Sequence, residues 1–343
     1  MKVLIIGSNS IHVSSYVKSL AEKESDIFLL TEENCSFDHV KGEFMVNFRD
    51  LNPISLIKNY FKLKKYLLFL QPDVIHVHQL NRLAYFVTRI ASKLKIPVVS
   101  TAWGSDVLLI PFKNRFFRFL TKKAIERSVT VTADAEIMIE SMQLLVKSDV
   151  KYELLQYGIE MVDPVEKEDV IFSNRLHKDL YRIDQVIDYF CEFSKLNSSW
   201  KLVIGAEGEK TEMLKDKVNT LNISDKVEFV GWLLPADNKS WYAKSKIYIS
   251  IPESDGTSVS VLEAMSAGCI PILSDIGVSY ELIEKGENGI IEKKNENPLD
   301  RAILLNREEV YLRNRALVEL KASRNRCTDR FIEIYSNAIR HEN

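Results

Sequence analysis

Residues 252–274, PESDGTSVSVLEAMSAGCIPILS, predict one complete unit of a parallel α/β fold. The apolar run KIYISI (residues 246–251) precedes them and is typical of a buried strand. A turn rich in Gly, Thr and Ser follows, then a helix of small residues, and a second apolar run begins after Gly268. A strand, a turn, a helix and a strand make a βαβ unit. Ligands bind beyond the carboxyl ends of such strands, where helix N-termini favour phosphate, so this turn is the candidate ligand site.

The same alternation of apolar runs and helical segments recurs along the other parts of the 343-residue chain. Apolar strands separated by helices predict doubly wound parallel sheets that are covered on both faces. The strands that we expect are 2–6, 26–31, 73–79, 97–103, 129–134, 152–158, 169–173, 201–206, 226–232, 246–251, 269–275 and 289–293. Residues 158–169 carry Pro and charge without an apolar period, which predicts a linker between two domains.

The length also favours two domains. We expect an N-terminal domain of residues 1–160, completed by a C-terminal helix at 325–343, and a C-terminal domain of residues 161–324. Two Rossmann-like domains of this kind are expected to face each other across a cleft, in which hinge motion encloses a ligand.

Composition excludes several classes of protein. The net charge of -2 gives no bulk field for nucleic acid, and no run of 18 apolar residues predicts a transmembrane helix. The N-terminal apolar run is too short for a signal peptide. No His, Asp, Glu or Cys cluster has metal-ligand spacing, so no metal is expected. Reduced thiols in a cytoplasmic protein are expected for the four scattered cysteines, Cys35, Cys191, Cys269 and Cys327.

Positive charge is concentrated between residues 58 and 123, where thirteen Lys and Arg oppose two acids, thirteen minus two giving +11. Its densest parts, 58–70 (KNYFKLKKYLLFL) and 112–123 (FKNRFFRFLTKK), interleave aromatic residues with cations. This composition is typical of helices that lie on an anionic membrane surface. The alternative is an ordinary amphipathic helix with its aromatic residues in the core and its cations in water.

The turn after residue 251 has the groups that a phosphate needs. Gly256 allows close approach of the backbone, and Thr257 or Ser258 can cap the helix, which leaves the amides of residues 258–260 for phosphate oxygens. Glu263 lies one turn inside the helix among apolar neighbours and needs a polar partner. A ribose diol can be that partner, because one carboxylate accepts from both hydroxyls. The alternative is a capping box formed by Ser260-x-x-Glu263.

The whole segment resembles the E-x7-E signature of family 4 glycosyltransferases, retaining enzymes of GT-B fold. Asp255, seven residues and Glu263 match the spacing, and GTSVSVLEAMSAG extends the match. Asp replaces the first Glu, as in the DGT-type branch of the family. The resemblance implies that Asp255 contacts sugar hydroxyls, that Glu263 binds the ribose and that the amides between them hold the diphosphate.

Other stretches resemble the family in the same order. SNRLHKDLYRIDQVI (173–187) is similar to the segment whose Arg and Lys neutralise the leaving diphosphate. Arg175 matches the Arg of that segment, and the alternative is that it is a surface charge. Tyr181, Arg182 and Lys178 lie near the position of the Lys. VIGAEGE (203–209) resembles the GxG turn, and FVGW (229–232) resembles the base-binding loop. The implied catalytic residues are Arg175, Asp255 and Glu263. The implied donor-binding residues are Arg175, Lys178, Gly205, Trp232, Asp255, Gly256, Thr257, Ser258, Val259 and Glu263.

In this family the N-terminal domain binds the acceptor. DVIHVH and STAWGSD resemble the DVxHxH and TxHG segments, with Trp103 in place of the His. His76 and His78 alternate on one expected strand and should face the same side, with His78 nearer the strand end. His12 lies in the first βα turn, where a core or capping role is the alternative. The implied acceptor or cleft residues are Ser8, His12, His78, Trp103 and Asp106.

The resemblance implies a retaining glycosyltransferase that moves a sugar from a nucleotide sugar, UDP favoured over GDP, without a metal ion. A glycan or lipid-linked acceptor in bacterial surface polysaccharide synthesis (lipopolysaccharide, O-antigen or capsule) is expected, at the inner face of the cytoplasmic membrane. The alternatives are a non-catalytic GT-B partner subunit of another glycosyltransferase and a sugar-nucleotide epimerase. GSNSIH has one Gly only, which argues against a dinucleotide oxidoreductase.

Overall fold

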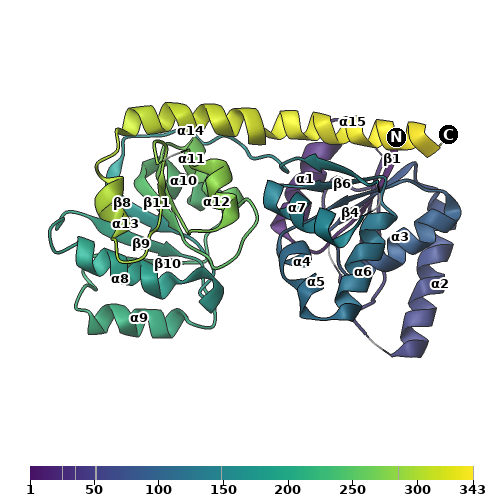
Figure 1. Ribbon diagram of the computed structural model, residues 1–343, viewed down its shortest axis with the longest axis horizontal. Coiled ribbons are helices and arrows are strands. Elements are labelled where there is room, and N and C mark those ends of the chain that lie inside the picture. The colour runs from purple at the N-terminus through teal and green to yellow at the C-terminus, as the bar shows by residue number, and fades with distance from the viewer. Residues whose placement is uncertain (25, 35, 51, 148, 285, 343) are drawn as a thin grey trace. The chain divides into compact units, whose positions relative to one another are not determined.

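The computed structural model describes residues 1–24, 26–34, 36–50, 52–147, 149–284 and 286–342. The chain divides into two compact units. Unit 1 is Met1–Gly158 with Arg324–Asn343, and unit 2 is Ile159–Ser323 (Figure 1). The two crossings between the units fall two residues and one residue before the expected boundaries.

Unit 1 contains a parallel sheet of seven strands in the order β3-β2-β1-β4-β5-β6-β7. The strands are β1 Lys2–Ile6, β2 Asp26–Thr31, β3 Gly42–Met45, β4 Val74–His78, β5 Val98–Thr101, β6 Thr130–Ala133 and β7 Lys151–Leu154. The sequence did not predict β3, because its GEFM is half-buried and exposed in alternation and has no apolar run. The strand order changes direction between β1 and β4, which makes this edge a ligand-binding switch point.

Unit 1 has helices on both sides of this sheet (Figure 1). They are α1 Ile11–Ala21, α2 Pro53–Leu70, α3 Arg82–Leu94, α4 Ser105–Leu108, α5 Ile110–Lys113, α6 Arg115–Glu126, α7 Glu136–Leu145 and α15 Arg324–Glu342. Residues 112–123 were expected as one helix, and the structure breaks them at Asn114. Its backbone is extended, and its side chain accepts from the amides of Phe116 and Phe117 at 3.0 Å, which starts a new helix there.

The C-terminal helix α15 belongs to the core of unit 1. Phe331, Ile334 and Tyr335 are buried in one cluster with Val3 and Ile5 of β1. The side chains of α15 thus belong to the same apolar cluster as the first strand of unit 1.

Unit 2 contains a parallel sheet of six strands in the order β10-β9-β8-β11-β12-β13. The strands are β8 Glu168–Ser173, β9 Lys201–Gly205, β10 Val227–Gly231, β11 Ser245–Ser250, β12 Ile270–Leu273 and β13 Ile290–Ile291. In β11, Ile247 and Ile249 join the apolar cluster on one face while Tyr248 joins the cluster on the other. The switch point of this sheet lies between β8 and β11.

Helices and one short 3-10 turn, η1, connect the strands of unit 2. They are η1 Asp179–Tyr181, α8 Ile183–Phe193, α9 Thr211–Thr220, α10 Pro235–Lys244, α11 Val259–Ser266, α12 Gly277–Leu282, α13 Pro298–Ala302 and α14 Arg307–Ala322. The sequence did not predict α10, which buries only Tyr242 and Ala243 and so lacks an apolar stripe.

Within the described residues, no helix has the length and apolar character needed to cross a membrane. Cys191, Cys269 and Cys327 form no disulfide within the described part of the chain, and Cys35 lies outside it.

Candidate functional site

The switch point of unit 2 brings together three residues of the expected donor set. Arg175 follows β8, and Asp255 and Ser258 follow β11. The Nη2 atom of Arg175 lies 2.6 Å from Oδ2 of Asp255, and its Nη1 donates to the hydroxyl of Ser258. The Arg175 side chain is 11% exposed and that of Asp255 is 27% exposed. The ion pair is therefore largely shielded from water, while one edge stays open.

Arg175 is a fixed positive charge. Burial lowers the pKa of Arg175, and the Asp255 carboxylate together with Tyr248 and Tyr181 raises that pKa by more, so the net pKa lies above its usual value. The guanidinium also lies 4.5 Å from the ring centre of Tyr181, in a cation–π contact. A planar, permanently charged donor of this kind suits phosphate oxygens.

The other cations of this segment lie differently. Lys178 is exposed and directly precedes η1. Arg182 forms an ion pair with Glu292, whose side chain is 9% exposed. Tyr181 stacks on Arg175 as described. Arg182 thus contributes to the packing of unit 2 through Glu292, and Lys178 is the nearby cation that faces solvent.

The helix α11 begins after Ser258, and its first turn is not capped by the Ser258 side chain. That hydroxyl accepts from Arg175 instead. Because Ser260 lies inside α11, the capping-box alternative for Glu263 does not apply. Gly256 and Thr257 are buried in the turn, and Val259 is the half-buried first residue of the helix.

Glu263 is half-buried and lies near two buried tyrosines. Burial raises the pKa of Tyr248, the charge of Arg175 and a hydrogen bond with Ser260 oppose this shift, and the charges of Asp255 and Glu263 add smaller increases. Burial likewise raises the pKa of Tyr242, with Glu263 again adding to the shift. The charges of Arg175, Asp255 and Glu263 therefore all act on the hydroxyl of Tyr248, which lies in β11.

Sequence reasoning missed a polar network behind this cluster. The amide nitrogen of Asn174 donates to Asn238 Oδ1 and to the hydroxyl of Tyr242, both at 2.6 Å, and the hydroxyl of Tyr248 donates to Asn174 Oδ1 at 2.7 Å. Asn174 adjoins Arg175, so the network fixes the backbone that carries the cation. The available signal was a tyrosine in the apolar run KIYISI, which needs a polar partner when buried.

Two expected donor-binding residues, Gly205 of the GxG turn and Trp232 of the base-binding loop, lie at the ends of β9 and β10, and β9 is next to β8 in the sheet. Gly205 ends β9 against Asn174, and a Cβ at Gly205 would lie 3.3 Å from that of Asn174. Trp232 follows β10 and is 69% exposed. An exposed indole at this edge can stack on a base.

His177 was also missed. It is buried, with Nδ1 at 2.8 Å from Thr211 Oγ1 and Nε2 at 3.2 Å from the Gly205 carbonyl. Burial lowers its pKa, so it holds the turn after β9 as a neutral side chain.

In unit 1, the first turn of α1, where the structure places His12 rather than in the preceding turn, lies close to the loop after β5. The exposed His12 ring lies 5.9 Å from the ring of Trp103, edge to face. The indole nitrogen of Trp103 donates to the hydroxyl of Tyr157 at 2.5 Å. Ser8 is half-buried in the loop after β1. The switch point of unit 1 thus has solvent-accessible side chains from His12, Ser8 and Trp103.

His78 lies in the interior. Its ring centre is 4.2 Å from that of His76, which confirms that the two residues share a face, and it stacks on Tyr157 at 5.3 Å. Both ring nitrogens are buried without a hydrogen-bond partner. Burial lowers the pKa of His78 to about 3, so the ring is neutral at physiological pH.

Asp106 is fully buried and joins two loops. Its Oδ2 accepts from the amide of Leu80 at 2.7 Å and its Oδ1 from the amide of Trp103 at 2.9 Å. Burial raises the pKa of Asp106, and the backbone donors oppose this shift. The carboxylate therefore positions the loops after β4 and β5.

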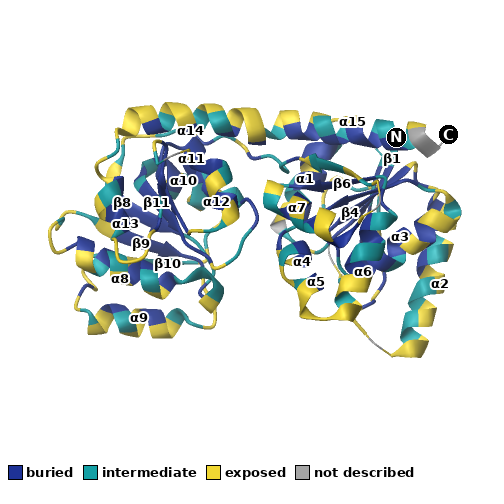
Figure 2. Ribbon diagram, viewed as in Figure 1, coloured by how far each residue is buried: buried dark blue, intermediate teal, exposed yellow. Residues whose placement is uncertain are grey.

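The basic helices of unit 1 expose apolar side chains. On α2, Leu63, Leu67 and Leu70 are buried. Much of the rest of α2 is exposed (Figure 2). The exposed apolar side chains of α2, α5 and α6 are Ile54, Ile57, Phe61, Leu68, Phe69, Phe112, Phe116 and Phe119. We call these eight residues the exposed apolar set; the alternative that places aromatic residues in the core does not hold for them.

Within the described ranges, no group of three or more His, Cys, Asp or Glu could hold a metal ion. The absence of a metal from the reaction stays a prediction.

Two family models match the chain. Residues 161–309 match the model described as glycosyl transferases group 1, and residues 2–135 match the model described as glycosyl transferase 4-like. The first match covers the β8 to β11 switch point, and the second covers the loops after β1, β4 and β5.

Curated relatives extend over almost the whole chain. An uncharacterised glycosyltransferase of Methanocaldococcus jannaschii is 24% identical and aligns over 90% of each chain. The N,N'-diacetylbacillosaminyl-diphospho-undecaprenol alpha-1,3-N-acetylgalactosaminyltransferase of Campylobacter jejuni is 23% identical over 95% of this chain and 94% of its own. The solved structure of Anabaena HepE in complex with UDP superimposes with a TM-score of 0.81 at 12% identity, over 98% of this chain and all of that one, and shows the same fold.

Proposed function

Because this chain belongs to the family 4 glycosyltransferases of GT-B fold, we propose that it transfers a hexose from a nucleotide sugar to a lipid-linked glycan with retention of anomeric configuration. The observation that carries the proposal is the cluster of Arg175, Asp255 and Ser258 at the switch point of unit 2. It combines a shielded cation with the N-terminus of α11, two features that stabilise a departing diphosphate.

Each donor residue then has a distinct task. Arg175 and the first-turn amides of α11 neutralise the diphosphate, and Glu263 accepts from the ribose hydroxyls. Asp255 pairs with Arg175 in the structure. The diphosphate carries more charge than one carboxylate and competes for the same guanidinium, which releases Asp255 toward the hydroxyls of the sugar.

Retention requires no protein nucleophile in this scheme. The bond between the anomeric carbon and the leaving diphosphate oxygen breaks, and the bond to the acceptor oxygen forms on the same face. The acceptor proton passes to the departing phosphate oxygen, whose negative charge Arg175 stabilises. Since this cation and the helix amides supply positive charge, we propose that the reaction needs no metal ion.

UDP is the favoured nucleotide of this proposal, supported by the UDP bound in the Anabaena structure and by the exposed Trp232. A lipid-linked acceptor is supported by the diphospho-undecaprenol in the name of the Campylobacter relative. The exposed apolar set supports contact with an anionic membrane, at the cytoplasmic face where surface polysaccharides such as lipopolysaccharide, O-antigen and capsule are built.

The test is substitution of the donor residues. Arg175→Ala and Glu263→Ala should each lower UDP-sugar turnover by about 100-fold or more, because each removes a group that acts on the transition state or its donor. Lys195→Ala, which removes an exposed lysine paired with Glu192, is the matched control and should retain full activity. Melting temperatures establish that all three variants fold.

Normal turnover in either site variant contradicts the proposed donor site. A thermal-shift panel of UDP, GDP and their sugars tests the nucleotide, because a ligand of the folded state raises the melting temperature. A wild-type chain that neither binds nor turns over any member would favour the non-catalytic partner subunit.

A further inference from the structure

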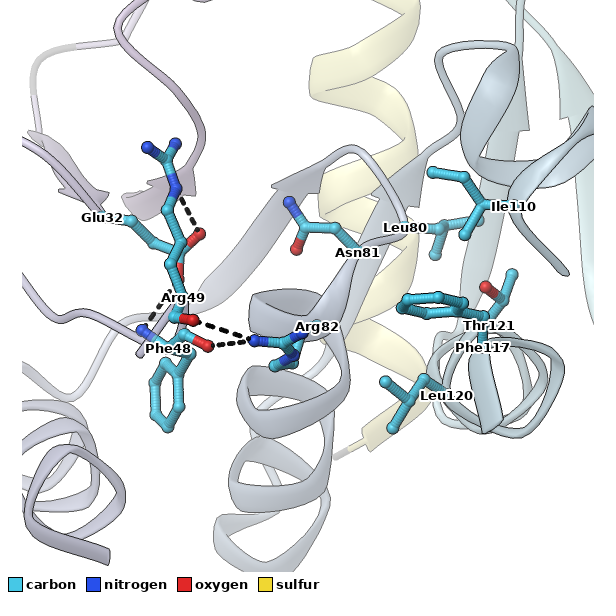
Figure 3. Close-up of a pocket in the computed structure, with 10 residues that line it drawn as sticks. All are labelled: Glu32, Phe48, Arg49, Leu80, Asn81, Arg82, Ile110, Phe117, Leu120 and Thr121. Atoms are coloured by element: carbon cyan, nitrogen blue, oxygen red, sulfur yellow. Dashed lines mark hydrogen bonds and ion pairs between the residues drawn. The ribbon is translucent and has the colours of Figure 1, made fainter. Parts of the chain in front are cut away.

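A pocket of about 290 Å³ lies in unit 1, where the chain leaves β4 and enters α3. Figure 3 shows its two sides, with Ile110, Phe117, Leu120 and Thr121 on one and Phe48, Arg49 and Glu32 on the other. Asn81 and Arg82 lie between them, and Leu80 lies beside Ile110. None of these residues belongs to the expected acceptor set.

Arg82 in this pocket lacks a counter-charge. It is the first residue of α3, whose first turn contains no acid, so its charge opposes the positive end of the helix dipole. Its Nη1 donates to the carbonyls of Phe48 at 2.8 Å and Arg49 at 3.3 Å. Its Nε is buried and has no hydrogen-bond partner. A partly buried cation without a counter-charge is costly, and an anion in the pocket would neutralise it.

Glu32 does not supply that anion. Its Oε1 accepts from the amide of Phe48 at 2.8 Å, and its Oε2 lies 3.4 Å from Nε of Arg49. Arg49 also approaches Glu33 at 3.5 Å. The two glutamates therefore interact with Arg49 and with the backbone. Among the residues that the structure describes, no carboxylate forms an ion pair with Arg82.

The opposite wall is apolar and leads toward the exposed apolar set. Phe117 and Leu120 of α6 line the pocket, and Phe116 and Phe119 of the same helix are exposed. The ring of Phe119 lies 5.9 Å from that of Tyr85 on α3, so α3 and α6 pack directly beside the pocket. A ligand of the pocket therefore meets a cation on one side and an aromatic wall that continues to the surface on the other.

We propose that this pocket binds the phosphate group through which the acceptor glycan is linked to its lipid. The phosphate lies against Arg82, and the first carbons of the lipid lie along Phe117 and Leu120. The inference rests on the proposed function, which supplies a lipid-linked acceptor. It adds the pocket that would hold the anionic junction between glycan and lipid.

Farnesyl diphosphate is the probe, because it joins a diphosphate to a short apolar chain, and calorimetry on the full chain measures its affinity. Arg82→Gln should weaken binding by at least about tenfold, through loss of a charge-assisted contact. Arg89→Gln is the matched control on α3, since Arg89 is exposed and donates to Tyr85, and it should bind as the wild type does. Phe117→Ser should weaken binding of farnesyl diphosphate and of farnesol, whereas Arg82→Gln should leave farnesol binding unchanged.

Equal affinities of the wild type and Arg82→Gln would overturn the inference, as would equal losses in Arg82→Gln and Arg89→Gln. Inorganic diphosphate that binds as tightly as farnesyl diphosphate would identify a site for free phosphate instead. Melting temperatures check folding, and Phe117→Ser tests the pocket independently if Arg82→Gln unfolds. UDP binding is measured on the same proteins. A wild-type protein that does not bind UDP would contradict the proposed function. A wild-type protein that binds UDP, with Arg82→Gln and Phe117→Ser both leaving farnesyl diphosphate binding unchanged, would contradict this inference alone.

Discussion

Asp255 and Arg175 form an ion pair in the donor cluster, so the loss of either charge leaves the other side chain without its partner. Asp255→Asn removes a carboxylate that competes with diphosphate for the guanidinium. We expect UDP itself to bind more tightly, by roughly 1 kcal/mol or about fivefold, while transfer of the sugar falls because its hydroxyl contact is weakened. Calorimetry with UDP and a turnover assay with the UDP-sugar separate the two effects. Parallel loss of UDP binding and transfer would show that Asp255 supports the site in another way.

His78 makes the stability of unit 1 depend on pH. Its folded pKa is about 3, against 6.5 for the free side chain, so the unfolded chain takes up the proton first. The free energy of unfolding is therefore unaffected by this group above pH 6.5 and falls as the pH drops from 6.5 toward 3. Between pH 7 and pH 5 the expected loss is about 2 kcal/mol.

His78→Phe keeps the stacking on Tyr157 and removes this proton uptake. Urea unfolding of the wild type and the variant at pH 7 and pH 5 measures the difference, and the buried His76 is present in both proteins. Identical pH dependence would refute the assignment to His78. An unchanged KM for acceptor in His78→Phe would remove this residue from the expected acceptor set.

The sequence located Arg175, Asp255 and Ser258 through a family pattern of fixed spacing. It did not locate Asn174, because the role of this amide depends on Tyr242 and Tyr248, which are distant in sequence. Asp106 was expected at the acceptor cleft from the family resemblance, and its burial between two loops could not be read from the local pattern. Residues whose task is set by long-range packing are the ones that a local pattern cannot assign.

At the scale of elements, α2 presents two apolar faces. Leu63, Leu67 and Leu70 pack inward, while Phe61 and Phe69 are exposed by 61% and 84%. A double change of Phe61 and Phe69 to Ser should reduce binding to vesicles that contain anionic phosphatidylglycerol, because it removes apolar area without touching the buried face. Leu320→Ser, at a 58% exposed position of α14, is the control.

Replacing Lys62, Lys64, Arg115 and Arg118 by Gln tests the electrostatic part of the same contact. Binding should fall, and its dependence on salt should weaken. Sedimentation with the vesicles measures both sets of variants. Unchanged partition of both sets would count against membrane contact.

Elements with strong apolar runs were predictable, and those without them were not. The buried strands of both sheets matched their expected positions closely, since most of them carry consecutive apolar residues that a covered parallel sheet accommodates. In contrast, β3 and α10 have little apolar period of their own and form against neighbours that the sequence does not reveal. The break at Asn114 depends on a side-chain cap within a basic run.

At the scale of the molecule, unit 1 depends on the last helix of the chain. Phe331 and Tyr335 of α15 are fully buried, and the hydroxyl of Tyr335 bonds to Tyr16 and to His76. Deletion of residues 324–343 should therefore unfold unit 1, because it exposes a core and leaves buried polar groups without partners. The donor cluster lies wholly in unit 2, so UDP should still bind the shortened chain.

Limited proteolysis and UDP thermal shift measure the two units separately. Rapid cleavage confined to residues 1–158, with UDP binding retained, is the expected pattern. A shortened chain in which residues 1–158 resist protease as they do in the wild type would contradict the role of α15.

The chain passes between the units twice, and in each unit the two crossing segments lie in contact with each other. In unit 2 the amide of Ile159 donates to the carbonyl of Ala322 at 2.8 Å, and in unit 1 a Cβ at Gly158 would lie only 2.6 Å from the Cα of Arg324. Unit 2 is thus an uninterrupted segment inserted into a discontinuous one. On the ribosome, every residue of unit 2 emerges before unit 1 receives its final helix. Unit 2, which carries the proposed donor site, can therefore complete its fold first although it is second in sequence, and the nascent unit 1 must remain open until α15 has been translated.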